Sequence, residues 1–477
     1  IFMTMKSGTI GELGETGTIY SLTTNEAGAK EAIEKLKPKL KGKVIGVQTS
    51  TIAAAFMKQY LDGIVEVREY KTTEQHDLDL YAGRVDAVFA SLAYLTSAQK
   101  KANNPDILIT GPRFQGGLLG RGTGIDDGGL ARFQRCGAVV VKTADNQYLR
   151  PVCARLAELG IPFEDWDAAR LRQELPFYDL QRYAPPRRPD DPAFGDSDGE
   201  IAGALLFPTS GYVNDPQLAA RNLQRAAEAQ GARFRFNTRV AAIRRAQGRV
   251  AGVTLADGTE IDAPVVVNVA GPHSGVVNRM AGVEDEMSVR TRPLRQEVAF
   301  VPAPPGVDFG LRPLVSADAD VGVYWRSDTG NRLLIGSLEP ACDELEWVDP
   351  DDWNRELTEQ WTAQVYRAAL RMPSLPIPQQ AQGTVALYDV SDDWIPIYDR
   401  SGLPGYYMAV GTSGNQFKNA PLAGVLMAEL IRACEAGHDH DRDPLRVKGR
   451  YTGFEIDLGF FSRLRPVNRD SSFSVLG

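Results

Sequence analysis

The sequence predicts a chain of two unlike parts, an α/β lobe in residues 1–125 and a larger mixed α/β and α+β region in residues 126–477. In the first part strands alternate with helices, which is typical of a parallel sheet. In the second part hairpin-like strand pairs accompany long amphipathic helices, which is typical of a mixed sheet. The balance between lysine and arginine also changes from one part to the other.

The lysine content locates the join between the two parts. Residues 1–125 hold 11 lysines and 4 arginines, whereas residues 126–477 hold 3 lysines and 35 arginines. The formal charge changes with it, from +2 (15 basic, 13 acidic) to -10 (38 basic, 48 acidic). Folding does not require this change, because both cations serve equally well on a solvated surface. It indicates either two domains of different history or a join between pieces of two unrelated genes, near the turn-like residues 120–129.

The overall composition excludes several classes of protein. With 43% hydrophobic and 24% charged residues, the chain is neither collagen-like, coiled-coil nor disordered. A net charge of -8 argues against a broad nucleic-acid surface. The four cysteines form no CxxC pair, so no metal site is expected. No membrane span and no signal peptide are recognisable, so a cytoplasmic location is expected.

The first part contains a candidate anion site. Its expected strands are 43–48, 65–70, 85–91 and 107–112, and its expected helices include 26–40 and 76–84. Ser50 and Thr51 lie in a hydroxyl-rich turn between the first strand and a helix, where free N–H groups favour an anion. Asp86 opens an otherwise apolar strand, either as a capping carboxylate or as the partner of a ligand ammonium group.

Three segments of this part carry a family resemblance. LKGKVIGVQTST, YAGRVDAVFAS and GPRFQGGLLGRGTGI resemble the second lobe of periplasmic binding proteins for polar amino acids and opines, over about residues 18–125. The resemblance implies that Ser50 and Thr51 bind a ligand carboxylate and that Asp86 binds its amine. The family's first lobe, which completes the ligand site, has no counterpart here, so the α/β lobe is incomplete.

The second part alternates helices and strands from residue 138 onward. Asp165 is the expected N-cap of a helix over 165–176, and Asp215 with Pro216 opens another helix. RFRFNTRVAAIRR predicts a broken strand pair and Asp257–Gly258 a hairpin turn. The other expected elements are strands 138–142, 265–271, 292–303, 321–327 and 332–340, helices 148–160 and 355–372, and a strand–loop–helix over 405–431.

The order of these segments resembles the FAD-dependent D-amino-acid, sarcosine and dimethylglycine oxidoreductase family over about residues 131–477. The segments that carry the resemblance are FNTRV, GRVAGVTLADGTEIDAPVVVNVAGPHS, a YWR strand, LYDVSDDWIPIYD and GTSGNQFK. It implies a glutathione-reductase-type FAD fold with a mixed-sheet substrate domain. The implied cofactor residues are Val240, Ala270, Gly271, Gly411, Thr412, Ser413, Gly414, Asn415, Gln416, Phe417 and Lys418.

The same resemblance assigns residues to a substrate pocket. Arg326 would pair with a substrate carboxylate, because an arginine is rarely buried without a partner. Lys418 would lie close to the flavin ring, although a solvated lysine is the alternative. Tyr324 and Trp394 would either contact the substrate or pack in the core.

One element of the family is missing. Its opening strand–helix–strand unit carries G-x-G-x-x-G, which binds the FAD diphosphate. Residues 8–14 have a different glycine spacing and no expected strand before them, and residues 116–124 belong to the binding-protein resemblance.

Three functions therefore stay open. The first is FAD-dependent oxidation of the C–N bond of an amino acid or a secondary or tertiary amine, impaired by the missing loop. The second is a module that binds an amino acid or opine, and the third is a non-functional fusion. The expected partner is a small amine or amino acid, and the oligomeric state is left open.

Overall fold

The computed structural model describes residues 1–21, 26–48, 52–90, 92–102, 104–115, 131–144, 146, 149–450 and 452–475. The chain forms two compact units, of which the first comprises residues 1–135 and 211–234 and the second residues 136–210 and 235–477. The predicted boundary at residue 125 lies in a segment outside the described residues. Residues 211–234 return to the first unit, where β12 (Gly211–Val213) pairs with β8 (Phe133–Arg135).

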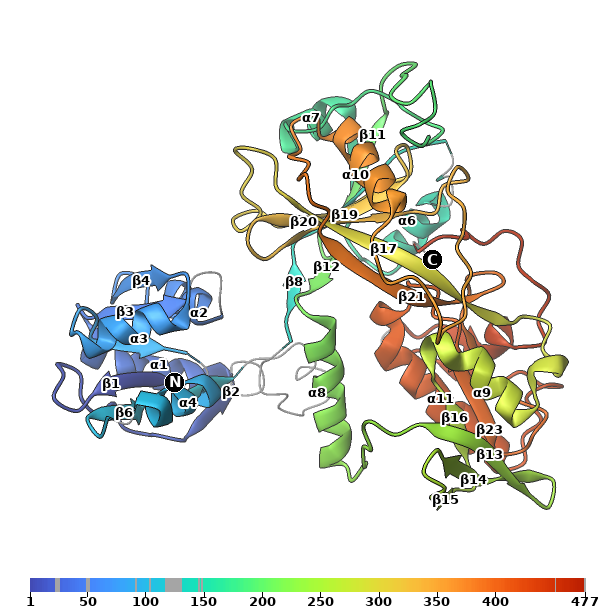
Figure 1. The fold of residues 1–477 in the computed structure, drawn as a ribbon, viewed down its shortest axis with the longest axis horizontal. Helices are drawn as coiled ribbons and strands as arrows, with labels where there is room; N and C mark the ends of the chain where they lie inside the picture. The colour runs from blue at the N-terminus through green and yellow to red at the C-terminus, as the bar shows by residue number, and fades with distance from the viewer. Residues whose placement is uncertain are drawn as a thin grey trace. The chain divides into compact units, whose positions relative to one another are not determined.

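The first unit is built on a five-stranded sheet (Figure 1). Its order is β4 (Glu66–Tyr70), β3 (Val44–Gln48), β5 (Ala87–Phe89), β1 (Phe2–Met5) and β6 (Ile107–Thr110). The four predicted strands all run in one direction, as expected, but β1 runs antiparallel between two of them. The sheet is therefore mixed. Four residues are a short signal, so the sequence pattern did not predict β1, and residues 8–14 do follow a strand.

Helices complete the first unit. The predicted helix over 26–40 is confirmed as α1 (Glu26–Leu40). The predicted N-cap Asp215 is also confirmed, because its side chain accepts the Leu218 N–H at 2.9 Å at the start of α8 (Pro216–Ala229). The other elements are α2 (Ile52–Tyr60), α3 (Thr73–Tyr81), α4 (Leu92–Ala102), α8 (Pro216–Ala229), β2 (Ile19–Ser21) and β7 (Arg113–Gln115).

The second unit contains an eight-stranded sheet (Figure 1). Its order is β10 (Glu164–Asp167), β11 (Gly203–Phe207), β9 (Ala138–Val141), β18 (Val315–Asp318), β19 (Val323–Asp328), β20 (Arg332–Ser337), β17 (Thr291–Pro302) and β21 (Gly383–Ser391). Every neighbouring pair is antiparallel except β9 and β18. This is the predicted mixed sheet, with β21 at one edge.

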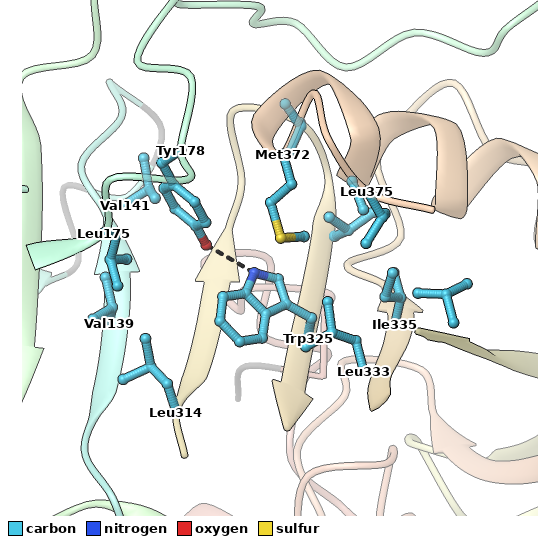
Figure 2. Packing of buried hydrophobic residues seen from close by; sticks show 14 of the residues in the cluster. Val139, Val141, Leu175, Tyr178, Leu314, Trp325, Leu333, Ile335, Met372 and Leu375 are labelled. Carbon is cyan, nitrogen blue, oxygen red and sulfur yellow. Dashed lines mark hydrogen bonds between the residues drawn. The ribbon is translucent and has the colours of Figure 1, made fainter. Parts of the chain in front are cut away.

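A large aromatic core supports this sheet. Trp325 in β19 is 1% exposed, and its indole N–H donates to the Tyr178 hydroxyl at 2.7 Å (Figure 2). Met372 and Leu375, at the end of α10 (Glu359–Arg371), are buried in the same cluster. Because Trp325 points into this core, its neighbours Tyr324 and Arg326 point to the opposite face of the sheet.

A smaller sheet and its helices form the rest of the second unit. Its strands are β16 (Val266–Asn268), β23 (Tyr406–Val410) and β22 (Ile397–Arg400), and β16 runs parallel to β23. The predicted hairpin turn joins β14 (Arg249–Leu255) to β15 (Glu260–Asp262). The remaining elements are α6 (Leu149–Glu158), α7 (Ala168–Glu174), β13 (Val240–Ala246), α9 (Ser274–Ala281), α11 (Ala420–Glu435), β24 (Arg446–Lys448), β25 (Glu455–Asp457) and the 3-10 turns η1 (Gly271–His273), η2 (Glu284–Glu286), η3 (Phe417–Asn419) and η4 (Leu458–Phe461).

Two local predictions for this unit are wrong. Asp165 lies within β10, and Asp167 is the N-cap of α7, accepting the Arg170 N–H at 2.7 Å. The strand pair expected over 233–245 is formed only in its second half, as β13. The start of α7 is displaced by two residues, which is the usual error at element ends, whereas residues 233–236 form no strand at all. Across the described ranges, no helix has the length and apolar content needed to cross a bilayer.

A buried ion group ties α10 to the large sheet. Arg371, 1% exposed, donates to Asp318 and to Asp320, each at 2.7 Å. It also donates to the carbonyl oxygens of Asp179 and Gln181 at 2.6 and 2.8 Å. Removing the cation would leave two carboxylates buried without their compensating charge, which is strongly destabilising.

We predict that Arg371→Met lowers the free energy of unfolding of the second unit by about 3–5 kcal/mol. All six tryptophans lie in this unit, so tryptophan fluorescence in urea measures its unfolding separately from that of the first unit. Arg442→Met is the matched control, because that side chain is 89% exposed. An equal, small effect of both substitutions would contradict the structural role of Arg371.

Candidate functional site

The predicted cofactor segments meet at one end of the small sheet. Asn268 of β16 pairs with Met408 of β23, and the two strands run parallel. Their carboxyl ends therefore lie side by side, and residues 269–271 and 411–416 both leave the sheet there. In open α/β sheets, ligands bind in the crevice outside the carboxyl ends of the strands. The structure thus brings Ala270 and Gly271 to the same sheet end as Gly411 and the loop that follows it.

The loop over residues 411–416 requires glycine for steric reasons. Gly411 and Gly414 both have φ of +72°, a conformation that costs other residues about 1–2 kcal/mol. A Cβ at Gly414 would also lie 2.5 Å from Cε2 of Tyr388. The Tyr388 ring therefore packs directly against the loop backbone, so this tyrosine borders the candidate cofactor segment.

Asp389 lies buried beneath this loop, with 2% of its surface exposed. Its Oδ2 accepts the Gly411 N–H at 2.6 Å and the Ser274 hydroxyl at 3.4 Å. Its main-chain oxygen accepts the Ser413 N–H at 2.7 Å. Burial raises the pKa of Asp389 to about 6, because the contacting groups are neutral hydroxyls and amides. One acidic side chain thus joins the loop to the start of α9.

Asn268 organises the other segment. Its Nδ2 donates to the Ser274 carbonyl oxygen at 2.9 Å and to Asn278 at 2.8 Å, and its Oδ1 accepts the Ala270 N–H at 3.0 Å. Gly271 has φ of +57° with open space where a Cβ would stand. Val269 is 67% exposed beside it. An exposed apolar side chain next to an open backbone turn is suited to contact with a flat ligand.

The end of the loop carries the predicted lysine. Lys418 Nζ donates to the carbonyl oxygen of Asn415 at 2.7 Å. The residue as a whole is exposed, but its ammonium group is folded back on the loop, where partial desolvation lowers its pKa. Within the described part of the chain, the buried Nδ2 of Asn415 has no hydrogen-bond partner. A buried donor without a partner fits a ligand that offers an acceptor.

Tyr388, Tyr324 and Glu339 form an interacting group on the face of the large sheet opposite Trp325. Tyr324 and Tyr388 are hydrogen-bonded to each other, and burial raises the pKa of both. Glu339 accepts hydrogen bonds from Gln296 and from the Val475 N–H, each at 3.3 Å. Burial, assisted by the charge of Asp343, raises the pKa of Glu339 to about 8. Shifted carboxyls of this kind are concentrated at functional sites.

Two other predicted substrate residues lie nearby in different environments. Arg326 lies two residues after Tyr324, and it donates to the Ser327 carbonyl oxygen at 2.9 Å and contacts Asp328 at 3.5 Å. Trp394 is 4% exposed and packs in a cluster with Leu294 and Val390. Core packing, the second of its two predicted roles, describes this tryptophan. Val240, at the start of β13, packs against the cluster that includes Tyr406 and Met408.

Of the three residues predicted to form a ligand clamp in the first unit, the structure describes Asp86. Its Oδ2 accepts the Val44 N–H at 2.8 Å and its other oxygen accepts the Thr9 hydroxyl. Val44 begins β3, and Gln48, about 13 Å away along the strand, ends it. Ser50 and Thr51 follow Gln48 in sequence and lie outside the described residues. Because β3 and β5 are parallel, Asp86 lies at the end of the sheet opposite Gln48.

Comparison with known proteins identifies the family of the second part. Residues 119–430 match the FAD dependent oxidoreductase (DAO) family. Because this match spans more than half of the chain, the protein belongs to that family, whose cofactor is FAD. The glycine oxidase of Geobacillus kaustophilus is 26% identical over 244 residues, which are 50% of this chain and 58% of that protein.

Two further comparisons bear on the fold and on the first part. The structure of L-proline dehydrogenase from P. horikoshii is similar in fold, with a TM-score of 0.52 and 18% identity over 82% of this chain and 93% of that one. The octopine-binding periplasmic protein of Rhizobium meliloti is 39% identical over 140 residues, 29% of this chain and 48% of that protein. The chain thus spans about half the length of these curated relatives.

The described residues fit one end of FAD. Val269 next to Gly271, and Phe417 directly after the loop over 411–416, are exposed apolar side chains of the kind that contact a flat aromatic ring. The buried donor of Asn415 adds a polar contact. For the diphosphate, the described part of the chain holds no strand–turn–helix with G-x-G-x-x-G spacing. The site therefore fits the ring end of the cofactor.

The structure adds three residues to those predicted for the site. Tyr388, Asp389 and Glu339 were not singled out from the sequence. Asp389 carries a signal, since it is a charged residue inside an apolar strand, in VALYDVS. Tyr388 and Glu339 have no such signal in the sequence. Tyr388 stands out only because it packs against Gly414, and Glu339 only because of its contacts with Gln296 and Val475.

The pKa of Glu339 gives a prediction for stability. Since its pKa is about 8 in the folded protein and 4.5 as the ordinary value, the folded state holds this proton more tightly than the unfolded chain. The stabilisation that the protonated Glu339 gives to the folded state is full below about pH 4.5, and it is lost as the pH rises to about 8. Glu339→Gln should therefore gain stability relative to the parent protein between about pH 5 and 8, on the order of 3 kcal/mol.

Urea unfolding at a series of pH values, followed by tryptophan fluorescence, measures this difference. Glu344→Gln is the control, because Glu344 is exposed on the adjoining segment. If the free energy of unfolding changed with pH in the same way in the Glu339→Gln variant and in the parent, this prediction would be contradicted.

Proposed function

We propose that this protein oxidises the C–N bond of an amino acid or of a secondary or tertiary amine to an imine, with FAD as the acceptor. The observation that carries the proposal is the convergence of residues 269–271 and 411–418 at one end of the β16–β23 pair, beside Tyr388. Membership of the FAD dependent oxidoreductase family and the similarity to glycine oxidase support the same chemistry.

Each side chain has a distinct part in the proposed reaction. When bound, FAD supplies a two-electron acceptor, and the protein supplies orientation and electrostatics. Arg326 binds the substrate carboxylate by charge-assisted hydrogen bonds, exchanging its contact with Asp328 for the substrate. Tyr388 and Tyr324 form the polar wall between the loop and Arg326. Lys418 places a positive charge beside the loop, where it stabilises negative charge that develops next to it.

The same proposal includes a weakened cofactor site. The diphosphate of a dinucleotide is ordinarily held by backbone N–H groups of a glycine-rich turn at a helix N-terminus. With only the ring end of the cofactor contacted by described residues, FAD affinity is lower than a complete site would give. The join between the two parts of the chain would then limit the enzyme through its cofactor.

We predict that titration with FAD perturbs the visible flavin absorption and that an amine or amino-acid substrate bleaches it in the absence of oxygen. Lys418→Met should slow this bleaching about a hundredfold, because a charge aimed at the reacting group is lost. Lys448→Met, an exposed lysine in β24, should leave the rate unchanged. A spectrum identical to that of free FAD at millimolar protein would contradict the proposed oxidation.

A second candidate function concerns the first unit. The 39% identity to an octopine-binding periplasmic protein favours a weak site for an opine or a basic amino acid. Binding should be weak, because two-lobed proteins of this type bury their ligand by closing the lobes on it. If neither this site nor the flavin site binds a ligand, the chain is a non-functional fusion.

Calorimetric titration of the full chain with octopine, arginine and lysine tests this candidate, and we predict heat only at millimolar ligand. Asp86→Asn should leave the affinity unchanged, because Asp86 caps β3 and contacts Thr9. Loss of binding in this variant would show that the carboxylate reaches the ligand after all, and the absence of heat would exclude the candidate.

A further inference from the structure

Asp389 occupies a junction of four segments in the second unit. It lies on β21, the edge strand of the eight-stranded sheet, where it is paired with Pro293 of β17 on one side. On the free side its main-chain oxygen accepts the Ser413 N–H at 2.7 Å. The Ser391 N–H donates to the Ser413 hydroxyl at 3.3 Å, two residues further along β21. The loop over 411–413 is therefore attached to the open edge of the large sheet.

The carboxylate of Asp389 extends this attachment to the small sheet. Its Oδ2 receives the Gly411 N–H from the end of β23 and the Ser274 hydroxyl from the first residue of α9. The Thr291 hydroxyl and the Thr412 N–H also donate to the Asp389 carboxylate. Four donors from three segments thus converge on one carboxylate group. None of these donors is charged, so neutral hydrogen bonds, and not an ion pair, hold the carboxylate in place.

The position of Asp389 matters because of what lies on each side of it. Two segments border the candidate ring site. One is the turn over 269–271, which precedes α9, and the other is the loop over 411–416, which follows β23. Among the described residues, the strand pairing that leads to them ends at Asn268 and Met408, so their spacing depends on side chains. Asp389 is bonded to the loop and to Ser274 at once. Its neighbour Tyr388 faces the opposite side of β21 and packs against Gly414.

We propose that Asp389 is a positioning residue that sets the distance between the loop over 411–416 and the start of α9, and thereby shapes the ring end of the FAD site. The flavin part of this inference rests on the proposed function. Replacement of the carboxylate would leave the donors of the buried residues Gly411 and Ser274 without their acceptor. The loop would then have to open toward solvent to satisfy them.

The substitution Asp389→Asn tests this most directly, because the amide keeps the shape but replaces one acceptor with a donor. Hydrogen exchange followed by mass spectrometry is measured on the full chain without added flavin. We expect exchange at least tenfold faster in peptides that cover 405–419 and 268–281, with unchanged exchange in a peptide over α10. Asp257→Asn is the matched control, an exposed aspartate that also accepts a backbone N–H, from Thr259 at 2.9 Å.

Rescue separates positioning from general stability. Asp389→Glu restores a carboxylate and should recover part of the protection and part of the FAD affinity, whereas Asp389→Asn should weaken FAD binding at least tenfold. Thr291→Val removes only one of the donors and is the second variant should Asp389→Asn not fold. It is expected to raise exchange in the same two peptides, to a smaller extent.

Two results would overturn the inference. One is exchange that rises equally in all peptides, α10 included, and the other is unchanged exchange in the loop of either variant. If the parent chain binds no FAD, the proposed function fails, but the exchange measurement still decides whether Asp389 holds the loop. If FAD binds and the variants bind it equally well with altered exchange, the positioning role in the flavin site is excluded while the proposed oxidation stands.

Discussion

The parallel pairing of β16 with β23 is the constraint on which the candidate site depends. Parallel strands end at the same edge of a sheet, so the segments after Asn268 and Val410 leave the sheet together. An antiparallel pair would have sent them to opposite ends, about a strand length apart. Glycine at 271, 411 and 414 then lets the backbone turn back over this edge. The large sheet contributes through its edge strand β21, which carries Tyr388 and Asp389 to the same place.

Four carboxyls of the second unit show how the hydrogen-bond partner decides the effect of burial on the pKa. Burial works against ionisation of Asp393, but its bidentate pair with Arg465 keeps its pKa below the usual value. The pKa of Asp343 is lowered in the same way, by its pair with Arg367. Asp389 and Glu339 have neutral hydrogen-bond donors instead, so burial raises the pKa of each. An arginine partner therefore keeps Asp343 and Asp393 ionised, whereas Asp389 and Glu339 lack such a partner among their hydrogen bonds in the described residues.

Local pattern was sufficient for much of the fold. Apolar segments predicted the four co-directional strands of the first unit and four of the eight strands of the large sheet, because buried strands leave that pattern in a sequence. Asp215 with Pro216 predicted the start of α8 correctly, since both act within one helical turn. The short strand β1 and the N-cap at Asp167 were missed, because four residues carry little pattern and aspartates stand at both 165 and 167.

The sequence by itself determined that the chain has two parts of different composition and that its second part belongs with flavin-dependent oxidoreductases, since residue content and motif order are properties of the chain alone. It also located the glycine loop over 411–414. Only the tertiary structure decided which side chains meet there. Tyr388 contacts Gly414, Glu339 is hydrogen-bonded to the Val475 N–H, and Asp86 is hydrogen-bonded to the Val44 N–H. These outcomes depend on strand order and direction, which join residues far apart in sequence and which no local pattern encodes.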